Sequence, residues 1–218
     1  MKPRVLLLSG LVLSLFLPAC NTVSDAYYGA AETVFGKQKR DILVSRVDSA
    51  RKAQESTKVQ FASALEQFQS VVKFSGGALE EKYAKLNAAY ERSKQSAANV
   101  RSRNDDVENV ARALFREWDA ELKQYTNPTL KASSAQQLQQ TRSRFEQMMA
   151  AMRRAEASID PVLRTFNDQV LYLKHNLNAQ AVGSLQNELR SVEANTAALI
   201  REMNASIAEA EKFIATMR

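Results

Sequence analysis

Residues 79–125 read LEEKYAKLNAAYERSKQSAANVRSRNDDVENVARALFREWDAELKQY, a run without glycine or proline. Mostly apolar residues recur in this run at alternating spacings of four and three, which places them on one helix face as in a coiled-coil seam. The seam comprises Leu79, Tyr83, Leu86, Tyr90, Ser93, Ala97, Val100, Asn104, Val107, Ala111, Leu114, Trp118, Glu121 and Tyr125. The run therefore predicts one helix of about 70 Å, because an α-helix rises about 1.5 Å per residue.

Three further runs repeat this spacing on either side of that helix. They cover residues 37–75, 138–173 and 185–217. Gly76-Gly77 separates the first run from residues 79–125, as expected of a helix C-terminus followed by a tight reversal. The next break is at Asn127-Pro128, because proline excludes the α conformation from the residue before it.

The third run leaves two alternatives open. It passes through Pro161, so the proline marks either a kink or a new helix that starts with Ser158 or Asp160 as its N-cap. The third and fourth runs form either one helix or two. If they are two, the turn between them falls near Asn176, Asn178 and Gly183.

These runs predict an all-α fold, an elongated antiparallel three- or four-helix bundle with coiled-coil seams. The chain of 218 residues has only six glycines and four prolines, too few for the turns of an all-β or doubly wound α/β fold. Pairing between chains satisfies the same seams, so a homo-oligomer formed through the helical seams is the alternative.

The N-terminus carries the pattern of an export signal. Two basic residues precede the uncharged, mostly aliphatic run 5–17, which is too short to cross a hydrocarbon core of about 30 Å. The run leads into LPAC at residues 17–20, which resembles the lipobox of bacterial lipoproteins. This resemblance implies that the Cys20 thiol is the lipid attachment site, with palmitate among its acyl chains, and that residues 1–19 are cleaved off.

The chain is thus expected to have three segments. Residues 1–19 are a lipoprotein signal peptide, residues 20–36 a lipid anchor and membrane-proximal segment, and residues 37–218 the helical bundle domain. The residue after the cysteine is Asn21 rather than aspartate. By resemblance to the Gram-negative sorting rule, this implies the periplasmic face of the outer membrane.

Composition and spacing argue against an enzyme. One cysteine and one histidine exclude a disulfide framework, a Cys/His zinc site and the common histidine-based triads. Residues 31–38 fail as a phosphate loop, because Ala31 and Gln38 replace its first glycine and its hydroxyl residue. Tyr172 stands three residues before His175, so the Glu-x-x-His motif of di-metal bundles is missing. We expect no catalytic residue, no metal ligand and no cofactor.

Charge argues against a nucleic-acid partner. Removing residues 1–19 removes Lys2 and Arg4 and no acid, which lowers the net charge from +6 to +4. Basic residues alternate with acidic ones along the helices, so they form no concentrated phosphate footprint.

One polar segment lies beside the apolar seams. It contains Lys174, His175, Asn176 and Asn178, and Asp168 precedes it. Two interpretations stand: a site that binds a partner or senses pH, or a capped and hydrogen-bonded turn.

The same segment carries a family resemblance. Residues 161–163 read PVL, residues 168–171 read DQVL and residues 173–179 read LKHNLNA. With the lipobox and the long seams, the chain resembles an uncharacterised domain-of-unknown-function family of Gram-negative coiled-coil lipoproteins, some members of which are labelled DNA-repair ATPases. The resemblance implies no established activity, and the missing phosphate loop argues against the ATPase label.

The sequence therefore predicts a lipoprotein anchored in the membrane, with a structural or scaffolding role in the cell envelope. One alternative is a docking or accessory subunit that binds an envelope protein or peptidoglycan. A second is a metal- or ligand-dependent site near Asp168 and His175.

Overall fold

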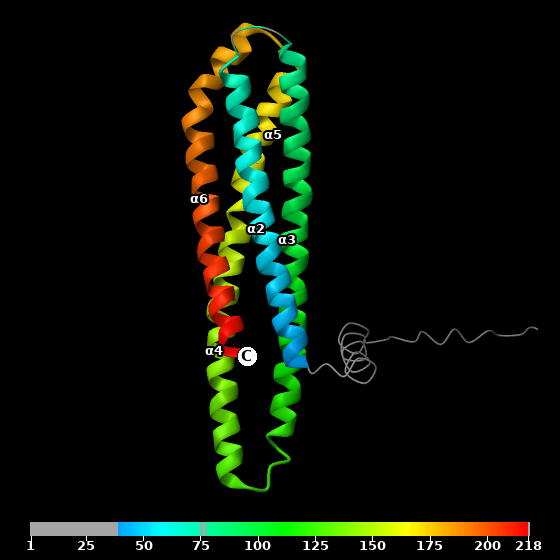
Figure 1. Cartoon of the computed structure of the whole chain (residues 1–218), viewed down its shortest axis with the longest axis vertical. Coiled ribbons are helices and arrows are strands. Elements are labelled where there is room, and N and C mark those ends of the chain that lie inside the picture. Colours follow the sequence, from blue (N-terminus) through cyan, green and yellow to red (C-terminus); the bar gives the residue numbers. More distant parts are fainter. Residues whose placement is uncertain (1–38, 75, 77, 218) are drawn as a thin grey trace, which may run out of the picture.

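The computed structural model describes residues 39–74, 76 and 78–217, which form an elongated helical bundle (Figure 1). Its helices are α2 (Lys39–Val72), α3 (Leu79–Glu121), α4 (Pro128–Ala157), α5 (Ile159–His175) and α6 (Ala179–Met217). Helices α4 and α5 follow one another as a single rod, so the described residues build four antiparallel rods and no strand. The predicted all-α bundle is confirmed, with four rods rather than three.

The reversals occur where glycine, proline and asparagine predict them. Gly76 has a φ of +139°, which L side chains rarely adopt, and it lies between α2 and α3. At the opposite end, the Asn127 Oδ1 accepts hydrogen bonds from the backbone N–H groups of Thr129 (2.9 Å) and Leu130 (3.1 Å). With Pro128 as the first residue of α4, this N-cap fixes where the helix begins.

The structure resolves both alternatives of the third run. The helix is interrupted for one residue at Ser158, which keeps helical dihedrals and donates its hydroxyl to the Ala155 carbonyl at 2.7 Å instead of capping α5. The feature is therefore an interruption of one rod and not a newly capped helix, and α5 starts two residues before Pro161. The third and fourth runs are separate helices divided at residues 176–178. Gly183 was wrongly placed at this turn, because it lies inside α6.

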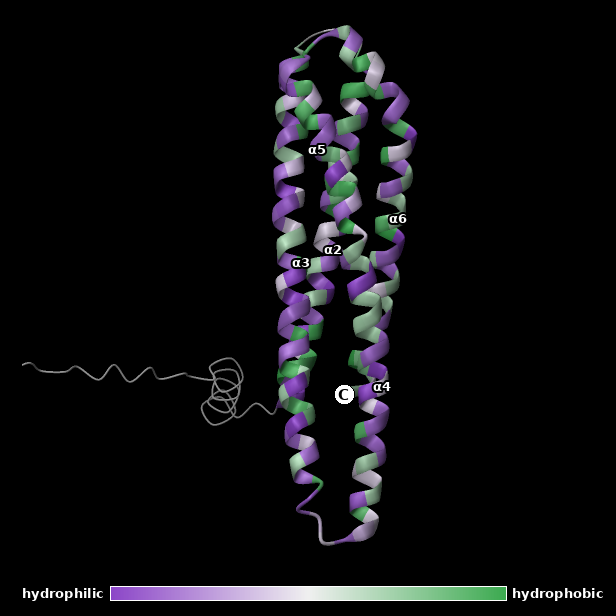
Figure 2. Ribbon diagram, turned by 180° about the vertical axis from the view of Figure 1, so that it is seen from behind, coloured by the Kyte–Doolittle hydropathy of each residue, from purple (hydrophilic) through white to green (hydrophobic). Residues whose placement is uncertain are grey.

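The seams bury two hydrophobic clusters along the bundle. The upper cluster, toward the turn between α2 and α3, includes Phe61, Phe68 and Phe166. The lower cluster, toward the α3–α4 hairpin, includes Leu43 and Phe213. Hydrophobic and hydrophilic residues alternate along each helix, as expected when only one stripe of each faces the core (Figure 2).

Polar residues are buried close to the boundary between the clusters. Gln54 on α2, Asn104 on α3 and Ser206 on α6 are fully buried there. The Asn104 Nδ2 donates to the Glu156 Oε2 at 2.8 Å, whereas both amide atoms of Gln54 have no protein partner. Asn104 therefore occupies a buried position of the predicted seam, where a polar residue can set helix register.

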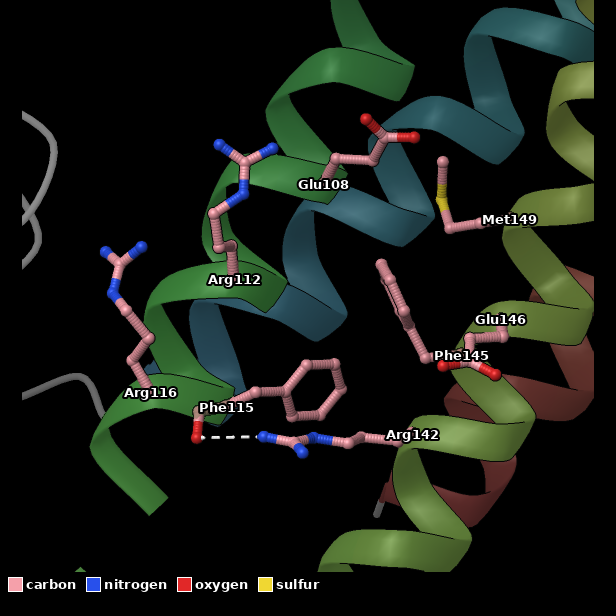
Figure 3. Close-up of a pocket in the computed structure, with 8 residues that line it drawn as sticks. All are labelled: Glu108, Arg112, Phe115, Arg116, Arg142, Phe145, Glu146 and Met149. Carbon is pink, nitrogen blue, oxygen red and sulfur yellow. Dashed lines mark hydrogen bonds between the residues drawn. The ribbon is translucent and has the colours of Figure 1, made fainter. Parts of the chain in front are cut away.

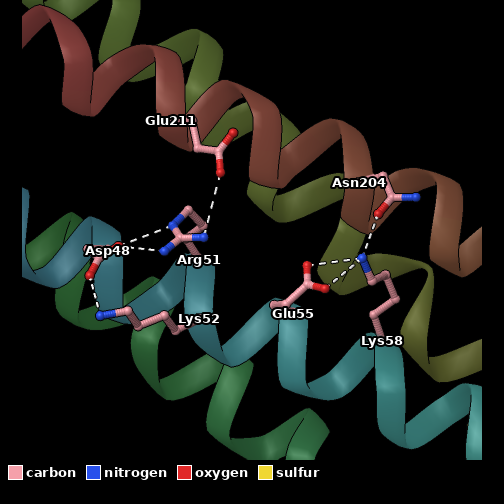
Figure 4. A network of polar contacts seen from close by, with 7 residues as sticks. All are labelled: Asp48, Arg51, Lys52, Glu55, Lys58, Asn204 and Glu211. Atoms are coloured by element: carbon pink, nitrogen blue, oxygen red, sulfur yellow. Dashed lines mark hydrogen bonds and ion pairs between the residues drawn. The ribbon is translucent and has the colours of Figure 1, made fainter.

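Outside the core, charged side chains link α2 to α6 (Figure 4). The Arg51 Nη1 lies 3.6 Å from the Glu211 Oε1, and the Lys58 Nζ donates to the Asn204 Oδ1 at 3.1 Å. Hydrogen bonds from Lys52 and Arg51 lower the pKa of Asp48 on the same surface. These contacts are solvated, so they orient the helices more than they stabilise them.

Candidate functional site

The polar segment singled out in the sequence forms the corner between α5 and α6. The Asn178 Oδ1 accepts a hydrogen bond from the Ala181 N–H at 2.9 Å and so caps the start of α6. The Asn176 Nδ2 donates to the Tyr172 carbonyl at 2.8 Å, one turn back in α5. The two asparagines therefore form the capped and hydrogen-bonded turn that was one of the two interpretations.

The same corner exposes apolar and charged side chains together. Leu171 is 52% exposed and Tyr172 is 40% exposed, and Lys174 and His175 are exposed beside them. Asp168 is also exposed, seven residues before His175 on α5, which is about 10 Å along the helix. We call residues 171–178 the α5–α6 corner; it lies at the opposite end of the bundle from the start of α2 (Figure 1).

Metal ligands do not gather near this corner. Within residues 39–74, 76 and 78–217, no three histidine, cysteine, aspartate or glutamate side chains converge on one point. The described structure therefore gives no support to the alternative of a metal-dependent site at Asp168 and His175.

A groove between α3 and α4 was not predicted from the sequence. It holds about 570 Å³ between the two helices (Figure 3). Its lining comprises Glu108, Arg112, Phe115, Arg116, Arg142, Phe145, Glu146 and Met149. We call this site the α3–α4 groove. Its phenyl rings and methionine provide apolar surface, and its arginines and glutamates provide charge.

Two phenylalanines join the sides of the α3–α4 groove. The Phe115 and Phe145 rings meet edge to face with centroids 5.5 Å apart, a favourable aromatic geometry. The Arg142 guanidinium lies 5.3 Å from the Phe115 ring centroid and also pairs with Asp119. Phe145 belongs to the predicted seam, but Phe115 lies one residue past the seam position Leu114, so the repeat alone does not find it.

A cluster of ion pairs, in which one arginine contacts three acidic side chains, borders the α3–α4 groove at Glu108. Arg153 on α4 donates to the Glu108 Oε1 at 3.1 Å, the Asp105 Oδ1 at 2.8 Å and the Glu156 Oε2 at 2.7 Å. The hydrogen bond to Glu108, followed by those to Asp105 and Glu156, raises the pKa of Arg153 above its ordinary value. Asp105 and Glu108 on α3 are thus tied to α4 through Arg153.

The last surface lies where α2 and α6 end. A cavity of about 360 Å³, the end cavity, is lined by residues that include Lys39, Leu114, Trp118 and Met217. Trp118 belongs to the predicted seam, where burial is expected, but its side chain is only partly covered and its Nε1 donates to the Ser134 Oγ at 2.8 Å. The reason is that Trp118 lies just beyond the last turns of the neighbouring helices.

The remaining predicted site residue, Cys20, lies outside the described residues. Across the part of the chain that the structure describes, no helix is long and apolar enough to cross a membrane. Chemically, the α3–α4 groove offers arginine, glutamate and apolar surface, and its lining contains no serine, cysteine or histidine nucleophile.

The fold and these surfaces define an all-α protein, an elongated antiparallel helical bundle with a groove between α3 and α4. The chain belongs to the family of proteins of unknown function DUF2959, whose model matches residues 27–217. The match confirms the resemblance to an uncharacterised family that the sequence carries, and it covers the whole bundle. No curated protein matches the chain.

Proposed function

We propose that this protein is a lipid-anchored rod with a structural or scaffolding role in the cell envelope. In this proposal Cys20 carries the lipid, the outer membrane holds the anchor, and the bundle faces the periplasm. The observation that supports it best is the placement of the two ends. The chain leaves the bundle at Lys39, toward one end, while the α5–α6 corner lies at the other (Figure 1).

The dimensions of the bundle suit a spacer. Helix α3 alone has 43 residues, which at about 1.5 Å per residue spans about 65 Å. Buried side chains fill the interior in two clusters, so the rod needs no partner chain over the length that these clusters cover. A rod of this kind holds two surfaces at a fixed separation, which is the property that a scaffold needs.

The absence of an enzymatic role is part of the proposal. The surfaces described above offer binding chemistry, and the single histidine lies on the exposed α5–α6 corner. The charged residues alternate in sign along the helices, which supports a protein or membrane partner over nucleic acid.

A second candidate function is that of a docking subunit. Leu171 and Tyr172 together form an exposed apolar patch flanked by Lys174 and His175. Apolar side chains rimmed by polar ones are typical of protein-binding sites. In this candidate, the α5–α6 corner binds an envelope protein or peptidoglycan at the end remote from the anchor.

Photo-crosslinking in intact envelopes tests both candidates. A photoreactive amino acid is introduced in place of Leu171, or in place of Val59 as a matched control, since Val59 is 62% exposed on the side of the rod. Each variant is made with Cys20 and with Cys20→Ser. Linked species are then identified by mass spectrometry.

A self-contained scaffold predicts self-links and bulk lipid from both positions. A defined envelope protein or glycan that links at position 171 and not at position 59, and only when Cys20 is present, shows that the docking candidate is right. Links to cytoplasmic proteins from either position would contradict both candidates.

A further inference from the structure

Two helices of the bundle extend beyond the other two. The first residue of α2 is level with Glu117, because the Lys39 Nζ lies 2.7 Å from the Glu117 Oε1. The last residue of α6 is at the same level, because Arg40 donates to the Met217 carbonyl. Helix α3 continues past Glu117, and α4 returns from Pro128 (Figure 1). Residues 118–137, the hairpin tip, therefore have no third helix against them among the described residues.

The inner side of the hairpin tip is built like part of a core. The end cavity of about 360 Å³ opens there, and Leu114, Trp118 and Met217 give it apolar surface while Glu121 and Gln137 give it polar groups. The seam of α3 continues along this side to Glu121, its last residue, which is exposed. A seam that is buried up to Leu114 and then uncovered indicates a missing neighbour.

We propose that residues 27–38 of the same chain cover this surface by continuing α2 along the inner side of the hairpin tip. The segment joins Lys39 directly, so it starts beside the cavity. As a helix, its 12 residues would extend about 18 Å. The hairpin tip extends ten residues past Glu117 to Asn127, at most about 15 Å as helix, so the two lengths match.

The spacing of apolar residues in this segment supports the same placement. Tyr28, Phe35 and Ile42 are seven residues apart, so a continued α2 puts all three on one stripe. Ile42 is partly buried and packs against the lower core cluster beside the fully buried Leu43, so this stripe borders the face of α2 that meets the bundle. Phe35 then falls one heptad below Ile42, close to the level of Trp118 and Glu121.

The chemistry of the segment fits the end cavity. Phe35, at the level of Glu121, gives an apolar ring to the surface that Leu114, Trp118 and Met217 line. Tyr28 falls one heptad further, about 10 Å along the helix, where its ring covers the tip and its hydroxyl reaches water. The family model matches residues 27–217, so the segment lies within the same family region as the bundle. Gly29 and Gly36 each weaken an isolated helix by about 1 kcal/mol, so its helicity depends on this contact.

Docking also fixes which end of the rod meets the membrane. With residues 27–38 held along the hairpin tip, only six residues separate Tyr27 from Cys20. If Cys20 carries lipid, as proposed above, the bundle stands on the membrane by its α3–α4 end. This consequence rests on the proposed function, whereas the docking itself does not.

Trp118 reports on the end cavity directly, because it is the single tryptophan of the chain. The experiment compares three forms of residues 20–218, all with Cys20→Ser so that lipid plays no part. These are the parent, the stripe variant Tyr28→Ser/Phe35→Ser, and the control Tyr27→Ser/Val34→Ser, whose changes fall about 100° round the helix on the stripe that continues to the exposed Asp41. Trp118 emission and its quenching by acrylamide are measured, and circular dichroism confirms that the bundle remains folded.

Docking predicts that the stripe variant shifts Trp118 emission to the red and increases the quenching constant, while the control matches the parent. Identical emission and quenching in all three forms would overturn the proposal. A stripe-dependent change that scales with protein concentration would assign the surface to a second copy instead. A blue shift of the parent that occurs only with added phospholipid vesicles would assign it to the membrane. Because every form carries Cys20→Ser, the Trp118 emission and quenching do not depend on whether the native Cys20 carries lipid.

Discussion

Replacing Phe166 with alanine should lower the free energy of unfolding by about 3–5 kcal/mol. Phe166 is fully buried, and its ring lies 6.5 Å from the Phe61 ring and 6.5 Å from the Phe68 ring, centroid to centroid. It therefore links α5 to α2 in the upper cluster. For a chain of this size the loss corresponds to a fall of about 6–20 °C in the midpoint of thermal unfolding.

The matched control for Phe166→Ala is Val59→Ala, which shortens a side chain that is 62% exposed. Substitutions at such a surface position change the free energy of unfolding by no more than about 0.5 kcal/mol. Denaturant unfolding followed by circular dichroism measures both variants. Equal and small effects would mean that the three phenylalanines do not form the core contact that the structure shows.

Replacing Gln54 with methionine should raise stability by about 1–3 kcal/mol. Gln54 is fully buried, and neither its Nε2 nor its Oε1 has a protein hydrogen-bond partner. Its amide is thus removed from water without compensation. Methionine has a similar shape and no polar group to bury, so the substitution keeps the packing and removes the penalty.

The control for Gln54→Met is the same change at Gln60, also on α2. The Gln60 Nε2 donates to the Ala89 carbonyl at 3.1 Å, so this amide has a partner to lose. Gln60→Met should give no increase in stability. Urea unfolding of both variants decides the matter, and a loss of stability in Gln54→Met comparable to that in Gln60→Met would show that the Gln54 amide is satisfied in the core.

The helices were predictable because their signal is local and repeated. Every seam position of α3 from Leu79 to Leu114 is buried or partly buried, as the alternating spacing of four and three requires. The pattern fails at Glu121, which is exposed, and at Tyr125, which is exposed and lies beyond the end of α3. Burial of a seam needs a neighbouring helix, and among the described residues neither α2 nor α6 extends past the level of Glu117.

The candidate surfaces were predicted less well. Asn176 and Asn178 were singled out for their polarity, and the structure shows that each makes a local hydrogen bond at a turn. The α3–α4 groove depends on how far two helices separate, which no spacing within one helix records. At Ser158, either a kink or a cap suited the sequence, and the choice depended on how α5 packs on α3 and α6.

The central claim is that Cys20 anchors this rod in the outer membrane. The most direct test is to label cells with radioactive palmitate and then separate inner membrane, outer membrane and soluble fractions, for the native chain and for Cys20→Ser. The account predicts a labelled native chain in the outer membrane, and a Cys20→Ser chain that has neither label nor outer-membrane location. An unlabelled native chain in the cytosol, or a Cys20→Ser chain distributed like the native one, would contradict it.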